Sequence, residues 1–161
     1  TQMVTLYRES FELFACNAIC YNHESPRRGE SFVTRKITKS AAAISLGIQD
    51  HLTLGSIESR RDWGYAPDYV QGMWRMLQQD SADDYVLATG ESNRVEDFLT
   101  ASFETVHLDW RDYVRQDQAF MRPSEVSRLI GNADKAKRKL GWTATTRRVV
   151  KLPPSRDLST W

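Results

Sequence analysis

The sequence predicts an α/β fold, in which short buried strands alternate with amphipathic helices. Residues 13–21 (LFACNAICY) are apolar on both alternating faces, as is typical of a parallel strand covered by helices on both sides. Residues 31–46 carry apolar side chains at helical spacing, and residues 51–54 and 84–89 form further short strands between helical segments. This alternation favours a parallel sheet with helices packed against it.

The first elements follow from local signals. We expect residues 1–10 to be the end of a helix, because apolar side chains share one face and no capping residue precedes them. A dense polar loop, residues 22–29, follows the strand at 13–21. The helix over 31–46 is predicted to end at Gly47, since glycine accepts the left-handed conformation that closes many helices.

A loop is predicted over residues 56–66. Pro67 suits the first turn of the next helix. We expect four apolar side chains of this helix to face inward: Val70, Met73, Trp74 and Leu77. Asn93 and Glu96 resemble a capping box at the start of a further helix.

The C-terminal third is predicted to be less regular. It contains a helix start at Pro123 and a basic helix over 134–140 that is followed by Gly141. From Thr143 onward no apolar periodicity remains, so we expect a loose tail.

Composition excludes several classes of protein. The 161 residues include 22 basic and 21 acidic side chains, so no net field attracts nucleic acid or an anionic membrane. The longest nearly apolar run is too short to span a bilayer, and no secretory signal opens the chain, so we expect a cytoplasmic protein. The eight glycines are too far apart for a G-x-G-x-x-G or phosphate-binding loop, and the three histidines are too dispersed for a zinc site.

The loop 22–29 is the strongest candidate for a ligand site, because ligands bind at the carboxyl ends of strands in open parallel sheets. Arg27 and Arg28 could grip phosphates, and His23 could bond a cofactor. The alternative is a solvated turn with a structural histidine. Lys36 lies near a predicted helix N-terminus, where an anion gains from both the ammonium and the helix dipole; alternatively it is an ordinary surface lysine.

Two further arginines are candidates. Arg61 precedes Asp62 and Trp63, and an arginine beside an aromatic ring can bind a nucleotide. The alternative is a surface Arg61–Asp62 ion pair with Trp63 buried. Arg122 and Glu125 could hold phosphate and ribose hydroxyls, or they could simply lie at a capped helix start. The basic run 135–139 is best interpreted as a solvated helix face rather than a nucleic-acid site.

These same segments closely resemble the GDP-mannose 4,6-dehydratase family of the extended short-chain dehydrogenase/reductase superfamily. The matching segments are 22–36 (NHESPRRGESFVTRK), 61–74 (RDWGYAPDYVQGMW), 120–126 (FMRPSEV) and 132–142 (NADKAKRKLGW). The resemblance runs over residues 1–142. It implies a partial Rossmann-type fold, mainly the C-terminal substrate-binding lobe.

The resemblance also implies a function. The family is a carbon–oxygen lyase that converts GDP-mannose to GDP-4-keto-6-deoxymannose, on the route to GDP-fucose, with tightly held NADP. Carried over residue by residue, His23 and Arg28 would contact NADP. The residues that would contact GDP-mannose are Asn22, Val33, Lys36, Arg61, Arg122 and Glu125. The three cations in this set suit a diphosphate, and Glu125 suits sugar or ribose hydroxyls.

The departures from the family concern catalysis. The family carries a glycine-rich cofactor loop, a catalytic threonine and glutamate, and a Tyr-x-x-x-Lys pair in a part that has no counterpart here. No tyrosine of this chain has a lysine four residues on. We therefore expect no catalytic residue and no metal site in this chain, and a truncated member that is inactive alone. The alternative is a non-catalytic remnant or a weak nucleotide-sugar-binding module.

The resemblance divides the chain into three parts. Residues 1–30 would be a remnant of the NADP-binding domain, residues 31–142 the substrate-binding lobe, and residues 143–161 a divergent tail. Members of the family associate through helices beside the catalytic one, so a homo-oligomer is a further expectation.

Overall fold

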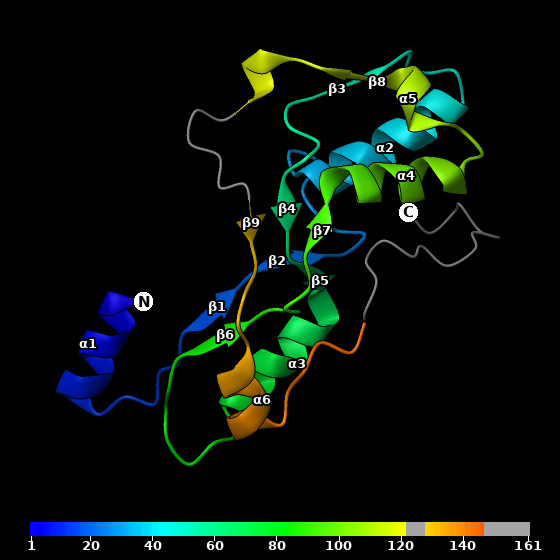
Figure 1. Ribbon diagram of the computed structural model, residues 1–161. Coiled ribbons are helices and arrows are strands. Elements are labelled where there is room, and N and C mark those ends of the chain that lie inside the picture. Colours follow the sequence, from blue (N-terminus) through cyan, green and yellow to red (C-terminus); the bar gives the residue numbers. More distant parts are fainter. Residues whose placement is uncertain (122–127, 147–161) are drawn as a thin grey trace. The chain divides into compact units, whose positions relative to one another are not determined.

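The structure is a computed structural model that describes residues 1–121 and 128–146 (Figure 1). These residues form two compact units, each built from segments distant in sequence. Unit 1 comprises residues 1–23, 62–91 and 130–146, and unit 2 comprises residues 24–61, 92–121 and 128–129. The three parts expected from the resemblance, residues 1–30, 31–142 and 143–161, stay a prediction, because the compact units say nothing of function. Which part holds cofactor and which holds substrate stays a prediction.

Unit 1 contains a parallel strand pair with helices. Its elements are α1 (Gln2–Phe11), β1 (Ala18–Cys20), β2 (Asn22–Glu24, whose last residue opens unit 2), β5 (Trp63–Tyr65), α3 (Ala66–Met76), β6 (Tyr85–Leu87) and α6 (Asp134–Leu140). β1 pairs parallel with β6, with Ile19 opposite Val86, and β2 pairs with β5. The core lies among α3, β6 and α6 and comprises Tyr69, Met76, Tyr85, Leu87, Ala136, Leu140 and Trp142.

Unit 2 is built around two helices that pack against each other, α2 (Val33–Ser45) and α4 (Val95–Thr105). Its other elements are β3 (Leu52–Leu54), β4 (Arg60–Arg61), β7 (Asn93–Arg94), α5 (Trp110–Tyr113), β8 (Val114–Gln116), the 3₁₀-helix η1 (Gln118–Phe120) and β9 (Arg128–Leu129). β3 pairs parallel with β8. β4 lies between β7, which is antiparallel to it, and β9, which is parallel to it.

Most helix boundaries agree with the local signals. α2 ends as predicted: Gly47 has φ +69°, its N–H donates to Ile44 O, and the Ile48 N–H donates to Ala43 O, which closes the helix in a Schellman motif. The capping box of α4 is shifted by one residue, because Asp97 Oδ2 accepts from the Arg94 N–H at 2.9 Å. The predicted helix start at Pro123 lies outside the described residues.

The first strand is shorter than predicted. Only Ala18–Cys20 of the run 13–21 is a strand, and Leu13 and Phe14 are each 48% exposed. The reason lies in Asn17, whose backbone N–H and Nδ2 both donate to Asp84 Oδ1, at 3.1 and 2.9 Å. These bonds align the chain with β6 only from Asn17 onward.

Two predicted loops contain strands. The loop 22–29 begins with β2, and the loop 56–66 contains β4 and β5. These strands are two or three residues long, too short for apolar alternation to show in the sequence.

Helix α3 buries the face opposite to the one predicted. The expected inward residues Val70, Met73, Trp74 and Leu77 are 37–62% exposed, whereas Asp68, Tyr69, Gly72 and Met76 are buried. Gly72 explains why this face is buried, because a Cβ at this position would lie 3.0 Å from both Leu87 and the Trp142 indole nitrogen. The helix therefore approaches the core most closely along the face with the smallest side chain.

The predicted loose tail is anchored over its first residues. The Asp68 carboxylate accepts hydrogen bonds from the backbone N–H and hydroxyl of Thr145, at 3.0 and 2.9 Å, and from the Thr146 N–H at 2.9 Å. Trp142 Nε1 donates to Asp68 O at 2.8 Å. A buried polar residue of α3 thus holds residues 142–146 in place.

Two carboxylates directly before β6 bind cationic side chains of α6 and α1. Asp83 accepts from Lys135 Nζ at 2.6 Å and Lys139 Nζ at 3.1 Å, and the Lys135 hydrogen bond is the largest cause that lowers the pKa of Asp83 to about 2. Asp84 accepts from Arg8 Nη1 at 2.8 Å, and this bond lowers the pKa of Asp84 well below its usual range. Part of the basic run 135–139 therefore makes ion pairs within unit 1.

Candidate functional site

Asn22 and His23 lie on β2, beside β5. Asn22 Nδ2 donates to Asp62 O at 3.1 Å, which ties the two strands together. His23 Nδ1 lies 2.8 Å from Tyr21 O. A carbonyl oxygen only accepts, so Nδ1 donates in this hydrogen bond and Nε2 is left for another group. The His23 ring lies 5.4 Å from the Tyr69 ring, centroid to centroid, which restrains its orientation.

Asp62 organises unit 1 in a way that the sequence analysis missed. Its side chain is fully buried and accepts four hydrogen bonds: Oδ1 from the Thr89 N–H (3.0 Å) and hydroxyl (2.6 Å), and Oδ2 from the N–H groups of Gly90 (2.9 Å) and Gly131 (3.2 Å). The expected alternative, a surface Arg61–Asp62 ion pair with Trp63 buried, is wrong for Asp62, which is not at the surface, and right for Trp63, which is buried. The Arg-Asp-Trp sequence contains no signal for this role, because the donors lie 27 or more residues away.

Arg28 is held at the start of unit 2. Its Nε lies 3.3 Å from Glu24 Oε2, and its guanidinium stacks over the Phe32 ring at 3.7 Å. Glu24 is buried and also accepts from Thr34 Oγ1 at 2.5 Å. The carboxylate and the ring fix the plane of the guanidinium near the first turn of α2.

Lys36 and Val33 lie in the first turns of α2. Val33 is the first helical residue and is half-buried. Lys36 Nζ donates to Thr53 O on β3 at 2.7 Å and lies 4.7 Å from the centroid of the Phe120 ring. The ammonium therefore has a defined position close to the positive end of the helix dipole.

Arg61 lies on the central strand of the small sheet in unit 2. It is opposite Asn93 on β7 and Leu129 on β9. Its Nη1 donates to Arg60 O at 2.9 Å. β9 directly follows residues 122–127, so Arg61 is joined through backbone pairing to the strand after the Arg122–Glu125 motif.

The predicted site residues fall into three sets. Asn22 and His23 belong to unit 1, and Arg28, Val33, Lys36 and Arg61 belong to unit 2. Arg122 and Glu125 lie outside the described residues. Within unit 2, the two candidates on α2 share the helix's first turns. Convergence of the whole set on one cleft stays a prediction.

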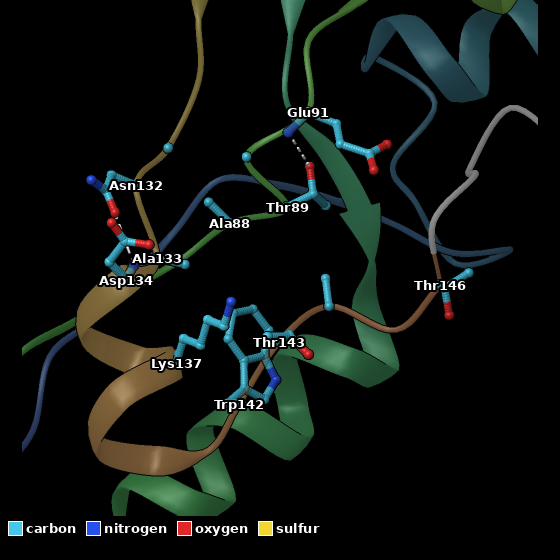
Figure 2. Close-up of a pocket in the computed structure, with 13 residues that line it drawn as sticks. Ala88, Thr89, Glu91, Asn132, Ala133, Asp134, Lys137, Trp142, Thr143 and Thr146 are labelled. Carbon is cyan, nitrogen blue, oxygen red and sulfur yellow. Dashed lines mark hydrogen bonds between the residues drawn. The ribbon is translucent and has the colours of Figure 1, made fainter.

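Unit 1 also contains a pocket of about 690 Å³ that includes none of the predicted site residues (Figure 2). Its lining residues are Ala88–Glu91, Gly131–Asp134, Lys137, Trp142–Ala144 and Thr146. Asp62 holds one side through Thr89, Gly90 and Gly131, and Asp68 holds the other through Thr146. The charged side chains of Glu91, Asp134 and Lys137 make the lining suited to a polar ligand.

Within residues 1–121 and 128–146, no three His, Cys, Asp or Glu side chains come together as a metal-binding group. No helix in the same residues has the length and apolar character needed to cross a membrane.

Comparisons with known proteins decide the family. The sequence model of a family described as "GDP-mannose 4,6 dehydratase" matches residues 1–149. The chain belongs to this family. It is 53% identical over 154 residues to GDP-mannose 4,6 dehydratase 2 of Arabidopsis thaliana, with 94% of the chain and 41% of the relative covered. It is 46% identical to GDP-mannose 4,6-dehydratase of Sinorhizobium fredii, with 89% of the chain and 46% of the relative covered.

The family match extends beyond Trp142, where the resemblance was expected to stop, to residue 149. The chain spans less than half the length of these GDP-mannose 4,6-dehydratase relatives. The activity, substrate and cofactor of the whole protein are therefore argued below as proposals.

Solved structures show the fold. The chain is similar to RMD from Pseudomonas aeruginosa complexed with NADPH, with a TM-score of 0.80 and 21% identity, over 89% of this chain and 47% of that one. It is also similar to dTDP-glucose 4,6-dehydratase from Bacillus anthracis in complex with NAD, with a TM-score of 0.75 and 16% identity, over 89% and 44% of the two chains. The predicted partial Rossmann-type α/β fold is confirmed.

Proposed function

We propose that this chain supplies the nucleotide-sugar-binding part of a GDP-mannose 4,6-dehydratase, which forms GDP-4-keto-6-deoxymannose from GDP-mannose with NADP. Family membership over residues 1–149 supports the substrate class. The chain alone would bind GDP-mannose and would not turn it over.

The position of Lys36 carries the proposal. The ammonium is held by Thr53 O at the N-terminal turns of α2. The first turn of a helix presents N–H groups without an intrahelical acceptor, so a diphosphate placed there gains hydrogen bonds as well as charge. Val33, at the first helical position, would contact the ligand beside these N–H groups. Arg61 would be the second cation of the site.

The residues outside the described ranges complete the proposal. Arg122 would supply the third cation for the diphosphate, and Glu125 would accept hydroxyl groups of the sugar or the ribose. Asn22, on β2, would offer an amide to the sugar. Homo-oligomerisation stays a prediction that the single chain does not test.

The residues expected to contact NADP fit such a group. Bound NADP would supply the hydride acceptor for oxidation at the sugar's 4-position. The His23 Nε2 takes no part in the Nδ1 bond to Tyr21 and could form a hydrogen bond with a ribose hydroxyl. Arg28 Nε is buried, lies 3.3 Å from Glu24 Oε2 and makes no hydrogen bond among the described residues. Its guanidinium therefore has donors left for a phosphate or hydroxyl oxygen.

Binding would be measured by isothermal titration calorimetry with GDP-mannose and with GDP. We expect Lys36→Met to weaken both about 10-fold or more, since a charge-assisted contact to phosphate is lost. Lys39→Met is the matched control, because Lys39 lies on the same helix but pairs with the exposed Glu30. Wild-type chain that binds neither ligand would refute the proposal.

Catalysis gives a separate test. Removal of the sugar hydroxyl proton needs a positioned base, and this chain has no Tyr-x-x-x-Lys pair. Ground-state binding by cations does not accelerate the reaction. We expect no 4-keto product from purified chain with GDP-mannose and NADP. Turnover that disappears when a residue of this chain is substituted would show that a base is present after all.

A further inference from the structure

The Phe120 ring faces the Lys36 ammonium in unit 2. Lys36 Nζ lies 4.7 Å from the ring centroid, within the range of a cation–π interaction, and 2.7 Å from Thr53 O. The ammonium is therefore bound from two directions, by a carbonyl and by an aromatic face. These two contacts select one side-chain conformation out of the many that a lysine can adopt.

The backbone holds Phe120 in this position. The Asp117 N–H donates to Leu54 O at 2.9 Å, and the Asp117 side chain accepts from the Ala119 N–H at 2.9 Å, which fixes the turn η1 against the end of β3. Gly55 allows the close approach, because a Cβ there would lie 2.4 Å from Phe120 O. Both partners of Lys36, Thr53 O and the ring, thus come from segments that are joined by backbone hydrogen bonds.

Phe120 is an exposed large apolar side chain. It is 55% exposed, so burial in the core does not set the position of the ring. Its contact among the described residues is with the Lys36 ammonium. A lysine ammonium has three N–H donors, and the Thr53 carbonyl uses one of them. The ring interacts with the charge of the ammonium and does not use up its other N–H donors as hydrogen bonds to oxygen would.

We propose that Phe120 is a positioning residue for Lys36 in the proposed nucleotide-sugar site. It restricts the ammonium to the N-terminal turns of α2, where the free donors meet a diphosphate, so that less side-chain entropy is lost on binding. This inference rests on the proposed function for its ligand. The contact itself exists in the free chain and is testable there.

The contact is tested first without ligand. A proton near the face of an aromatic ring shifts upfield in NMR, so we expect the Lys36 side-chain protons to be shifted upfield in wild type. Phe120→Leu keeps an apolar side chain and removes the ring, so the shift should vanish. Phe120→Tyr should retain it. Unshifted Lys36 resonances in wild type would overturn the inference, whether or not the chain binds GDP-mannose.

The role is tested by a double-mutant cycle on GDP-mannose affinity. Phe120→Leu should weaken binding about two- to fivefold, whereas Phe120→Tyr should not. In the Lys36→Met background, Phe120→Leu should have no further effect, which a merely structural role for Phe120 would not produce. Leu46→Ala is the control for an exposed apolar residue of unit 2. Equal losses in both backgrounds would overturn the inference while leaving GDP-mannose binding, and with it the proposed function, intact.

Discussion

Substitution of Asp62 tests the account of unit 1 most directly. Asp62→Ala removes one carboxylate that accepts four hydrogen bonds and leaves their donors without it. Gly131 is buried, so its orphaned N–H costs about 1–3 kcal/mol. Thr89 and Gly90 are accessible, so water replaces part of each of their three bonds and the loss is about 0.5–1 kcal/mol each. We expect a total of about 2.5–6 kcal/mol, a large part of the usual stability of a domain.

Urea unfolding followed by tryptophan fluorescence measures this loss, because Trp63 and Trp142 are buried in unit 1. Asp50→Ala, at an exposed position, is the control and should change the free energy of unfolding by less than about 0.5 kcal/mol. Asp62→Asn adds a second measurement. Its amide keeps an acceptor for Thr89 but turns a donor toward Gly131, so we expect it to destabilise by about 2–4 kcal/mol.

The reasoning would be refuted by an Asp62→Ala variant within about 1 kcal/mol of wild type. If that variant does not fold, hydrogen exchange on wild-type chain decides the point. The Gly131 amide should then be among the slowest to exchange in unit 1, since it is buried and bonded to a buried carboxylate. Exchange of this amide at the rate of an exposed loop would contradict the account.

Three further outcomes are expected. The Lys135 hydrogen bond lowers the pKa of Asp83 to about 2, below its unfolded value of about 3.9, so this residue stabilises the fold above pH 4. The free energy of unfolding, measured by urea titrations at each pH, should fall between about pH 4 and pH 2. The fall should be smaller in Asp83→Asn. Gly131→Ala should destabilise the fold by about 2 kcal/mol or more, because its Cβ would lie 2.2 Å from the Ala88 Cβ. In the control variant Gly29→Ala, the new Cβ meets only a flexible ring at 3.3 Å. Equal unfolding midpoints for the two variants would argue against the packing described. Trp74→Gln should lower the free energy of unfolding by less than about 1 kcal/mol, because Trp74 is 61% exposed. Met76→Ala, at a buried position, should lower it by about 2–4 kcal/mol. The reverse order in thermal denaturation would mean that α3 buries its other face.

Local sequence signals predicted helix positions well. Gly47 closes α2 because a left-handed φ is needed at that point and glycine adopts it without strain. Pro67 lies in the first turn of α3, where its missing N–H is not needed. These signals act over a few residues, so they can be recognised in the sequence without knowledge of the fold.

The candidate site was predictable only in part. The motif residues around Asn22, Lys36 and Arg61 were recognised by their resemblance to a family, and the family is confirmed. The contacts that hold these side chains in place were not predicted. The carbonyl of Thr53 and the ring of Phe120 reach Lys36 from segments 17 and 84 residues away, and neither carries a sequence signal for that contact.

The sequence by itself determined the fold class, the family and most helix ends, because each depends on residue order and local conformation. Only the tertiary structure decided which groups are buried. Helix α3 carries two apolar faces, and the packing of Trp142 against Gly72 selected the one that enters the core. Asp62 is fully buried because donors from distant segments converge on it. Burial of a face or a charge depends on partners that meet only when the chain folds, and no local pattern encodes them.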